Sequence, residues 1–250
     1  MHPASELIDA GLTLSRGQNP SLRHSMPTSG WLFGLNGTHL GEDLRLYPGS
    51  NAIGSSARCD VVVTAPEVGR QHAMINVVSG ESAIIQPGST RRQLYLNGNR
   101  CSGPSPLCFG DTIQMGEQAF AFISLIPTAR EEQIKITLLE RVRDFNSLTL
   151  AWLIEIKGER EGRDFRLFHG ENRIGSLAGA EVCLADSSIK QRQCVITRHV
   201  HNWTAVPHSV TDPLYVNGER TTGTGIQNGD LIGIEGYEFL FRSMTVDSLP

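Results

Sequence analysis

The sequence has no apolar run approaching the roughly 18 residues that a membrane-spanning helix needs, so it predicts no membrane span within this chain. Charge is also scarce: 22 Lys and Arg stand against 26 Asp and Glu, a net charge of −4, and charged residues make up only 19% of the chain. That balance argues against a nucleic-acid or acidic-membrane binder, because such proteins carry a basic surface. Aromatic residues make up 6%, which still suffices for a globular core.

Cysteine is rare and odd in number, with one residue each at Cys59, Cys101, Cys108, Cys183 and Cys194. Disulfide frameworks use even numbers, so we expect free thiols in a reducing, cytoplasmic setting. The Cys101–Cys108 spacing fits no standard zinc motif, and we expect no metal and no cofactor. The chain also lacks a nucleophile elbow, a Walker loop and an H-E-x-x-H motif, so we expect no enzyme activity.

Glycine and internal repetition are what the sequence has in abundance. Glycine accounts for 26 of 250 residues, which is typical of a turn-rich chain. A shift of 121 positions gives 12 identities over the 25 residues 31–55, where about one or two are expected by chance. The identities include three pairs with bulky or charged side chains: Trp31 and Trp152, Asp43 and Asp164, Arg45 and Arg166. The chain therefore contains a duplicated domain.

Each repeat has the pattern of short β-strands. Residues 44–46 alternate apolar and polar, as do residues 165–167 in the second repeat. Asn36-Gly37 stands where a hairpin turn is expected, and Asn97-Gly98 and Asn217-Gly218 are strong two-residue turn signals. Many short strands with glycine turns and little helical periodicity predict an all-β fold of two tandem β-sandwiches.

The repeat divides the chain into four segments: a tail at 1–28, a first repeat at 29–126, a linker at 127–149 and a second repeat at 150–245. The tail is rich in Ser, Pro and Gly and poor in apolar residues, which is typical of a flexible segment. A short helix at 5–13 is an alternative within it.

The linker has apolar residues at three- and four-residue spacing: Ile134, Leu138, Val142 and Phe145. This spacing predicts a helix of two to three turns that leans on one sandwich. Residues 134–138 also alternate apolar and polar, so a strand is the alternative.

Five landmarks of the first repeat resemble, in their order, the forkhead-associated (FHA) domain: Ile53-Gly54, the segment 59–63, the segment 70–75, Asn97-Gly98 and the segment 110–116. The resemblance covers about 30–126 and, through the repeat, 150–243. It implies an eleven-stranded β-sandwich of the kind that usually binds phosphothreonine peptides.

The residues of this chain at the family's phosphate pocket depart from the family pattern. The family has an Arg directly after Ile-Gly, where this chain has Ser55 and Ser176. The family's Ser three residues before the His is replaced by Gly69 in the first repeat and Lys190 in the second, and Gln193 stands in place of His72. Charge-assisted hydrogen bonds contribute about 1.5–3 kcal/mol each to the binding free energy, so their loss predicts that neither repeat binds phosphothreonine tightly.

The same departures resemble the FHA-like cytoplasmic domains of bacterial type III secretion inner-membrane ring proteins, which tend to read Ile-Gly-Ser at this position. Those proteins carry a transmembrane helix. Two alternatives follow: the chain is part of a longer, membrane-anchored protein at the cytoplasmic face of the inner membrane, or the resemblance stops at the domain.

The sequence therefore predicts a phosphate-independent protein-interaction scaffold, with phosphothreonine recognition by the first repeat as the alternative. The expected partners are proteins, either other secretion-apparatus subunits or further copies of this chain, and no nucleic acid. The candidate binding residues lie in the loops at one end of each sandwich: Ser55, Arg70, His72, Arg91, Arg92, Asn97 and Gly98 in the first repeat, and Ser176, Lys190, Arg192, Asn217 and Gly218 in the second. For His72 the competing role is to brace the backbone, and for the two asparagines it is turn geometry alone.

Overall fold

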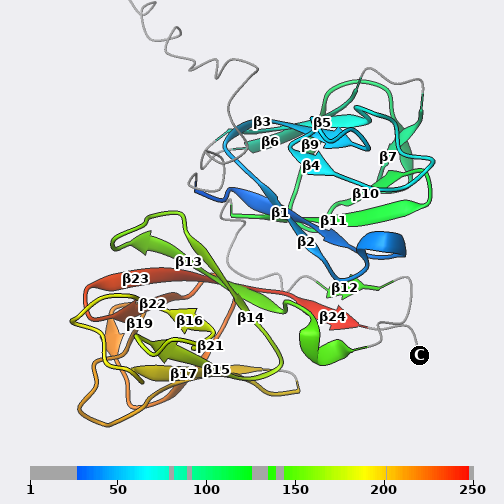
Figure 1. The fold of residues 1–250 in the computed structure, drawn as a ribbon. Helices are drawn as coiled ribbons and strands as arrows, with labels where there is room; N and C mark the ends of the chain where they lie inside the picture. The colour runs from blue at the N-terminus through cyan, green and yellow to red at the C-terminus, as the bar shows by residue number, and fades with distance from the viewer. Residues whose placement is uncertain are drawn as a thin grey trace, which may run out of the picture.

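The fold was obtained as a computed structural model that describes residues 27–78, 82–88, 92–125, 135–138, 144–200 and 202–247 (Figure 1). These residues form two β-sandwiches, one from each repeat, which confirms the all-β prediction. Within the described part of the chain, no helix has the length and apolar character that crossing a membrane requires. The alternative helix at 5–13 lies outside the described residues.

The first sandwich packs a six-stranded sheet, in the order β2-β1-β11-β10-β7-β8, on a five-stranded sheet, in the order β4-β3-β5-β6-β9. Its strands are β1 (Gly30–Gly34), β2 (Asp43–Leu46), β3 (Gly49–Gly54), β4 (Val61–Val62), β5 (Ala73–Val78), β6 (Ser82–Pro87), β7 (Leu94–Leu96), β8 (Asn99–Cys101), β9 (Ser105–Leu107), β10 (Thr112–Met115) and β11 (Gln118–Ser124).

The second sandwich repeats this topology with every label raised by twelve: β14-β13-β23-β22-β19-β20 packs on β16-β15-β17-β18-β21. Its strands are β13 (Ala151–Lys157), β14 (Asp164–Leu167), β15 (Gly170–Gly175), β16 (Val182–Cys183), β17 (Cys194–Arg198), β18 (Trp203–Pro207), β19 (Tyr215–Val216), β20 (Glu219–Arg220), β21 (Thr224–Ile226), β22 (Leu231–Ile234) and β23 (Tyr237–Ser243). Both sandwiches thus have the eleven strands that the FHA resemblance implies.

Residue alternation and turn chemistry explain these strands. In β5 the side chains of Ala73, Ile75 and Val77 are buried while the residues between them are more exposed, as a strand with one face on a core requires. Asn97 has φ 51° and Gly98 φ 75°, the left-handed pair that a two-residue hairpin needs, and this confirms the turn predicted there.

The connection after β1 differs from the prediction. A tight hairpin was expected at Asn36-Gly37, but the chain forms a 3₁₀ helix, η1 (Gly37–His39), before β2 begins. The Asn36 side chain donates to the Glu117 carbonyl at 2.8 Å and accepts from the Ala119 N–H at 2.8 Å. These two bonds tie the segment to the start of β11, a contact that local sequence does not reveal.

The linker is not the predicted helix where the structure describes it. Residues Lys135–Thr137 form β12, which pairs in parallel with β24 (Thr245–Asp247), and residues Phe145–Ser147 form one 3₁₀ turn, η2. The strand alternative is therefore confirmed at 135–137. The backbone of β24 offers hydrogen bonds from a segment far away in sequence, and these override the local helical spacing. Residues 139–143, the rest of the predicted helix, lie outside the described residues.

Thr28, the last residue of the segment that the sequence assigns to the tail, lies two residues before β1. Thr28 is buried, its N–H donates to the Gly162 carbonyl at 3.1 Å, and its hydroxyl donates to Asp164 at 2.9 Å. Both partners belong to the second sandwich, so Thr28 is held by contacts between the two repeats.

Candidate interaction loops and the interface between the repeats

Ser55 and Ser176 occupy the position where the FHA pattern has an arginine, and their hydroxyls are already bonded within the protein. Ser55 Oγ donates to the Val68 carbonyl at 3.1 Å, and Ser176 Oγ donates to the Ile189 carbonyl at 2.9 Å. Each serine therefore joins the loop after β3 or β15 to the loop before β5 or β17. A short neutral side chain in this role leaves no cation at the position.

The glycine before each serine permits that close approach. A Cβ on Gly54 would lie 2.5 Å from the Arg70 carbonyl oxygen, and one on Gly175 would lie 2.3 Å from the Gln191 carbonyl oxygen. Any other residue would push the two loops apart. The Ile-Gly-Ser sequence thus builds a closed loop junction in both sandwiches.

His72 braces the backbone beneath the first sandwich's loops. It is fully buried, its Nδ1 accepts from the Gly69 N–H at 3.0 Å, and its Nε2 lies 2.8 Å from the Gln93 carbonyl. A ring that accepts through Nδ1 and donates through Nε2 is neutral, and burial lowers the pKa of His72. Gln193 replaces the first of these two hydrogen bonds in the second sandwich, because its Oε1 accepts from the Lys190 N–H at 3.1 Å.

The first sandwich has an open hollow at its loop end. Ser55, Arg70 and Arg92 line this space of about 510 Å³ together with Pro66, Val68, Gly69 and Gln71. The structure therefore brings three of the predicted residues together around one hollow, with His72 buried behind it. Arg91, a fourth predicted residue, lies outside the described residues.

The corresponding end of the second sandwich contains an internal ion pair. Lys190 Nζ binds the carboxylate of Asp212, whose side chain is 1% exposed, and Asp212 also accepts from the Ser209 N–H. The hydrogen bond from Lys190 lowers the pKa of Asp212 below its usual value. The cation is therefore neutralised by the chain's own carboxylate. Arg192, the neighbouring candidate, is exposed.

Asn97 and Asn217 use their side chains to hold their own turns. The Asn97 amide donates to Asp111 at 2.7 Å and accepts from the Thr112 N–H at 2.8 Å. Asn217 repeats both bonds with Asp230 and Leu231. With Gly98 and Gly218 at positive φ beside them, these asparagines serve turn geometry, and none of the four residues lines the hollow of the first sandwich.

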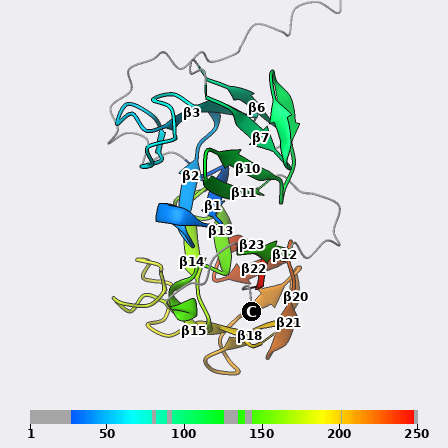
Figure 2. The same cartoon turned by 90° about the vertical axis from the view of Figure 1, so that its right-hand side faces the viewer.

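A second surface, which the sequence did not predict, joins the two repeats. Figure 1 shows β1 and β2 of the upper sandwich next to β13 and β14 of the lower one, and Figure 2 shows the same neighbours after a quarter turn. The Trp31 and Trp152 rings stack across this junction, with centroids 4.6 Å apart and planes inclined by 17°. Both tryptophans are fully buried.

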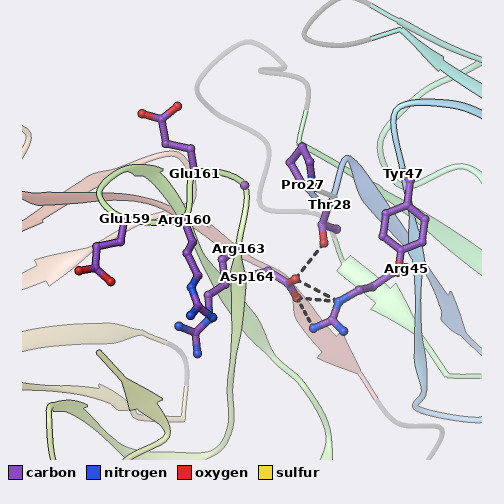
Figure 3. Close-up of a pocket in the computed structure, with 10 residues that line it drawn as sticks. Pro27, Thr28, Arg45, Tyr47, Glu159, Arg160, Glu161, Arg163 and Asp164 are labelled. Carbon is purple, nitrogen blue, oxygen red and sulfur yellow. Dashed lines mark hydrogen bonds and ion pairs between the residues drawn. The ribbon is translucent and has the colours of Figure 1, made fainter. Parts of the chain in front are cut away.

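Two ion pairs cross the same junction in reciprocal fashion. Arg45 donates to Asp164 through Nε at 3.0 Å and through Nη2 at 3.1 Å, as Figure 3 shows. Arg166 donates to Asp43 through Nε at 2.9 and 2.7 Å. The aspartate side chains are 4% and 8% exposed, whereas the arginines are about one-third exposed, so water reaches the cations more than the carboxylates.

The surroundings of the two aspartates differ. The Trp152 indole N–H donates to Asp43 at 3.0 Å, whereas the buried Trp31 indole N–H has no partner among the described residues. Asp164 accepts from Thr28 instead. Beside Asp164, a cavity of about 810 Å³ opens between the sandwiches, lined by Tyr47, Arg45 and the hairpin 159–164 (Figure 3).

Two family models match the chain in successive stretches. Residues 34–125 match the cytoplasmic domain of the inner membrane component of the type III secretion system, and residues 172–235 match the FHA domain. Both sandwiches are FHA-type domains. The FHA-type domain is a protein-interaction module, and the first one matches a model associated with type III secretion. The resemblance to FHA domains that the sequence shows is thereby confirmed.

Solved structures add similar folds at low identity. The protein EmbR from Mycobacterium tuberculosis, solved in complex with a low-affinity phosphopeptide, is 24% identical over 39% of this chain, with a TM-score of 0.36, and this chain covers 25% of its length. The FHA domain of CT664 from Chlamydia trachomatis is 21% identical over 39% of this chain and 98% of its own, with a TM-score of 0.36. An Arabidopsis thaliana FHA domain is 22% identical over 41% of this chain and 92% of its own, with a TM-score of 0.36. No curated protein matches the chain.

Other site chemistry is sparse in these FHA-type domains. Across the described ranges, no three His, Cys, Asp or Glu side chains gather in a cluster that could hold a metal ion. The signal that could have revealed the inter-domain surface was present in the repeat identities at Trp31, Asp43 and Arg45. Strand periodicity alone cannot show that such residues face another domain rather than solvent.

Proposed function

We propose that this chain is a phosphate-independent protein-interaction scaffold made of two degenerate FHA-type domains, acting as a structural or assembly component of a bacterial type III secretion system. The observation that carries the proposal is the state of the two loop ends. In both domains a bonded serine replaces the arginine, and in the second domain Asp212 already neutralises Lys190.

A phosphate group would gain little at either end. A dianion is bound tightly where a guanidinium fork and several hydroxyl or amide donors converge on it. At the second loop end, an incoming phosphate would have to compete with the buried Asp212 carboxylate for the charge of Lys190. Partner recognition there would use neutral backbone and side-chain groups.

The partners that suit this proposal are other subunits of the secretion apparatus, bound on the cytoplasmic side of the inner membrane. The match of residues 34–125 to an inner-membrane component of that system supports this assignment. Since the two domains pack on one another, a partner that touches both loop ends would gain from their linkage.

The hollow of the first domain favours a second candidate function, phosphothreonine-peptide binding through residues 55–92. Arg70 and Arg92 line that hollow, and Arg70 is exposed. Two cations beside an open space are a minimal anion site, although the serine and arginine of the family pattern are missing at Gly69 and Ser55.

Titration calorimetry with matched phosphothreonine and threonine peptides distinguishes the two functions. We expect the intact chain to prefer the phosphorylated peptide by less than about tenfold, or about 1.4 kcal/mol. The Ser55→Arg, Gly69→Ser double variant supplies the missing groups and serves as the positive control. A micromolar, phosphate-dependent affinity that is lost in Arg70→Ala would establish the second function instead.

A further inference from the structure

The contacts between the two domains follow a two-fold rule. Asp43 of the first domain pairs with Arg166 of the second, and the equivalent Asp164 of the second pairs with the equivalent Arg45 of the first. Trp31 stacks on its own equivalent, Trp152. When residue i contacts j and j contacts i, the interface is isologous, which is the form a symmetric homodimer takes.

The apolar part of the interface obeys the same rule. In β1 the side chain of Leu32 belongs to the core of the first sandwich, whereas Trp31 and Phe33 belong to the buried cluster shared with the second sandwich. In β13 the corresponding outward residues are Trp152 and Ile154, which are also buried. One strand from each domain thus presents its outer face to the other domain.

Three of the residues that cross this interface are shared by the two repeats. The tryptophan, the aspartate and the arginine are identical in both domains, whereas two loop-end residues, Gly69 and His72, are replaced by Lys190 and Gln193 in the second domain. A face that contains both the aspartate and the arginine can pair with a copy of itself. We call the outer surface formed by Trp31, Phe33, Asp43, Arg45 and Ile123 the paired face.

We propose that the paired face is a self-complementary docking surface for a second copy of this chain, covered by the second domain in the closed chain. A partner copy would place its own Arg45 on Asp43 and its own Trp31 on Trp31, through the geometry that the second domain uses now. Any event that separates the two domains would then lead to association of chains through their first domains.

The second domain is less suited than the first to pair with a copy of itself. Ile123 lies opposite Trp31 in the sheet register, and Arg242 holds the same place opposite Trp152. Arg242 is buried and donates to the Leu125 carbonyl of the first domain at 3.0 Å. Two second domains brought together would place two such guanidinium groups in one apolar interface, so the proposal assigns dimerisation to the first domain.

A charge swap in the full chain tests this. In the Asp164→Arg, Arg166→Asp variant, like charges meet across the interface within a chain, while the first domains of two chains still present Asp43 to Arg45. We expect this variant to form a reversible dimer of twice the monomer mass in sedimentation velocity at micromolar concentration. Adding Asp43→Arg and Arg45→Asp restores opposite charges within the chain and should return the protein to a monomer.

The Arg173→Glu, Glu181→Arg variant is the matched control, because it swaps an ion pair within the second domain and leaves the net charge unchanged. It should stay monomeric, and adding Trp31→Arg to the first charge swap should abolish the dimer. The proposal is overturned if the first swap stays monomeric, if it loses its fold rather than dimerising, or if its association persists in the fourfold variant.

Discussion

The Asp43 carboxylate should contribute more to stability than its equivalent, Asp164, although the two belong to mirrored ion pairs. Asp43 accepts from the buried Trp152 indole N–H as well as from Arg166, whereas Asp164 accepts from Arg45 and from the hydroxyl of Thr28. In the Asp43→Ala variant, the Trp152 N–H loses its acceptor in a place that water does not reach. An unsatisfied buried donor costs about 1–3 kcal/mol.

Loss of the ion pair with Arg166 adds a smaller amount to the destabilisation caused by Asp43→Ala. Arg166 is 36% exposed, so water can solvate it once Asp43 is gone, and the lost ion pair itself is worth roughly 1 kcal/mol or less. Together these effects predict that Asp43→Ala lowers the free energy of unfolding by about 1–4 kcal/mol. Asp164→Ala should lower it by about 1–2 kcal/mol, because the Thr28 hydroxyl can rotate to another acceptor.

Urea unfolding followed by tryptophan fluorescence measures both losses, because the two stacked rings lie at the interface. Glu181→Ala is the control, since its partner Arg173 is exposed and lies within one domain. We expect a loss below about 1 kcal/mol for the control. Equal losses at the two aspartates, or a loss below about 0.5 kcal/mol at Asp43, would show that the Trp152 indole hydrogen bond does not stabilise the fold as expected.

Three further changes test the loop ends. Burial lowers the pKa of His72, so the unfolded chain binds a proton at this residue more readily than the folded chain does. The stability that neutral His72 provides is therefore present above about pH 6.5 and is lost as the pH falls below that value. His72→Gln should flatten the dependence of the melting temperature on pH between pH 7 and 5. Gly54→Ala should lower the melting temperature by several degrees, because its Cβ would meet a carbonyl oxygen at 2.5 Å, whereas alanine at the open position Gly103 should have little effect. Lys190→Met removes the cation that lowers the pKa of Asp212, so carbon-detected NMR titration should show that pKa rising; an unchanged value would mean that the ion pair does not set it.

The fold could be predicted from the sequence because its signals are local or repeated. The Asn97-Gly98 turn needs left-handed backbone at both residues, and Asn-Gly supplies it without help from the rest of the chain. The Ile-Gly-Ser departure is likewise visible in the sequence, and the structure adds only where each serine hydroxyl is bonded.

The features that the sequence did not predict depend on contacts between residues far apart in the chain. Residues 135–137 lie in a linker whose apolar residues have helical spacing, yet they pair with β24 more than one hundred residues away. Trp31, Asp43 and Arg45 stood out as repeat identities, but their partners lie on another domain and no periodicity marks them as paired. The Lys190–Asp212 pair joins two loops 22 residues apart, and no motif predicts it.

The two FHA-type domains form one isologous pair through Trp31 and Trp152. Nuclear Overhauser contacts between the indole protons of these two residues, measured in a selectively labelled sample of the intact chain, test it most directly. We expect strong contacts between the two rings and slow solvent exchange of the Trp152 indole N–H, with that exchange accelerated in Asp43→Ala. Absence of any contact between the rings, together with rapid exchange of the Trp152 indole N–H in the unaltered protein, would contradict it.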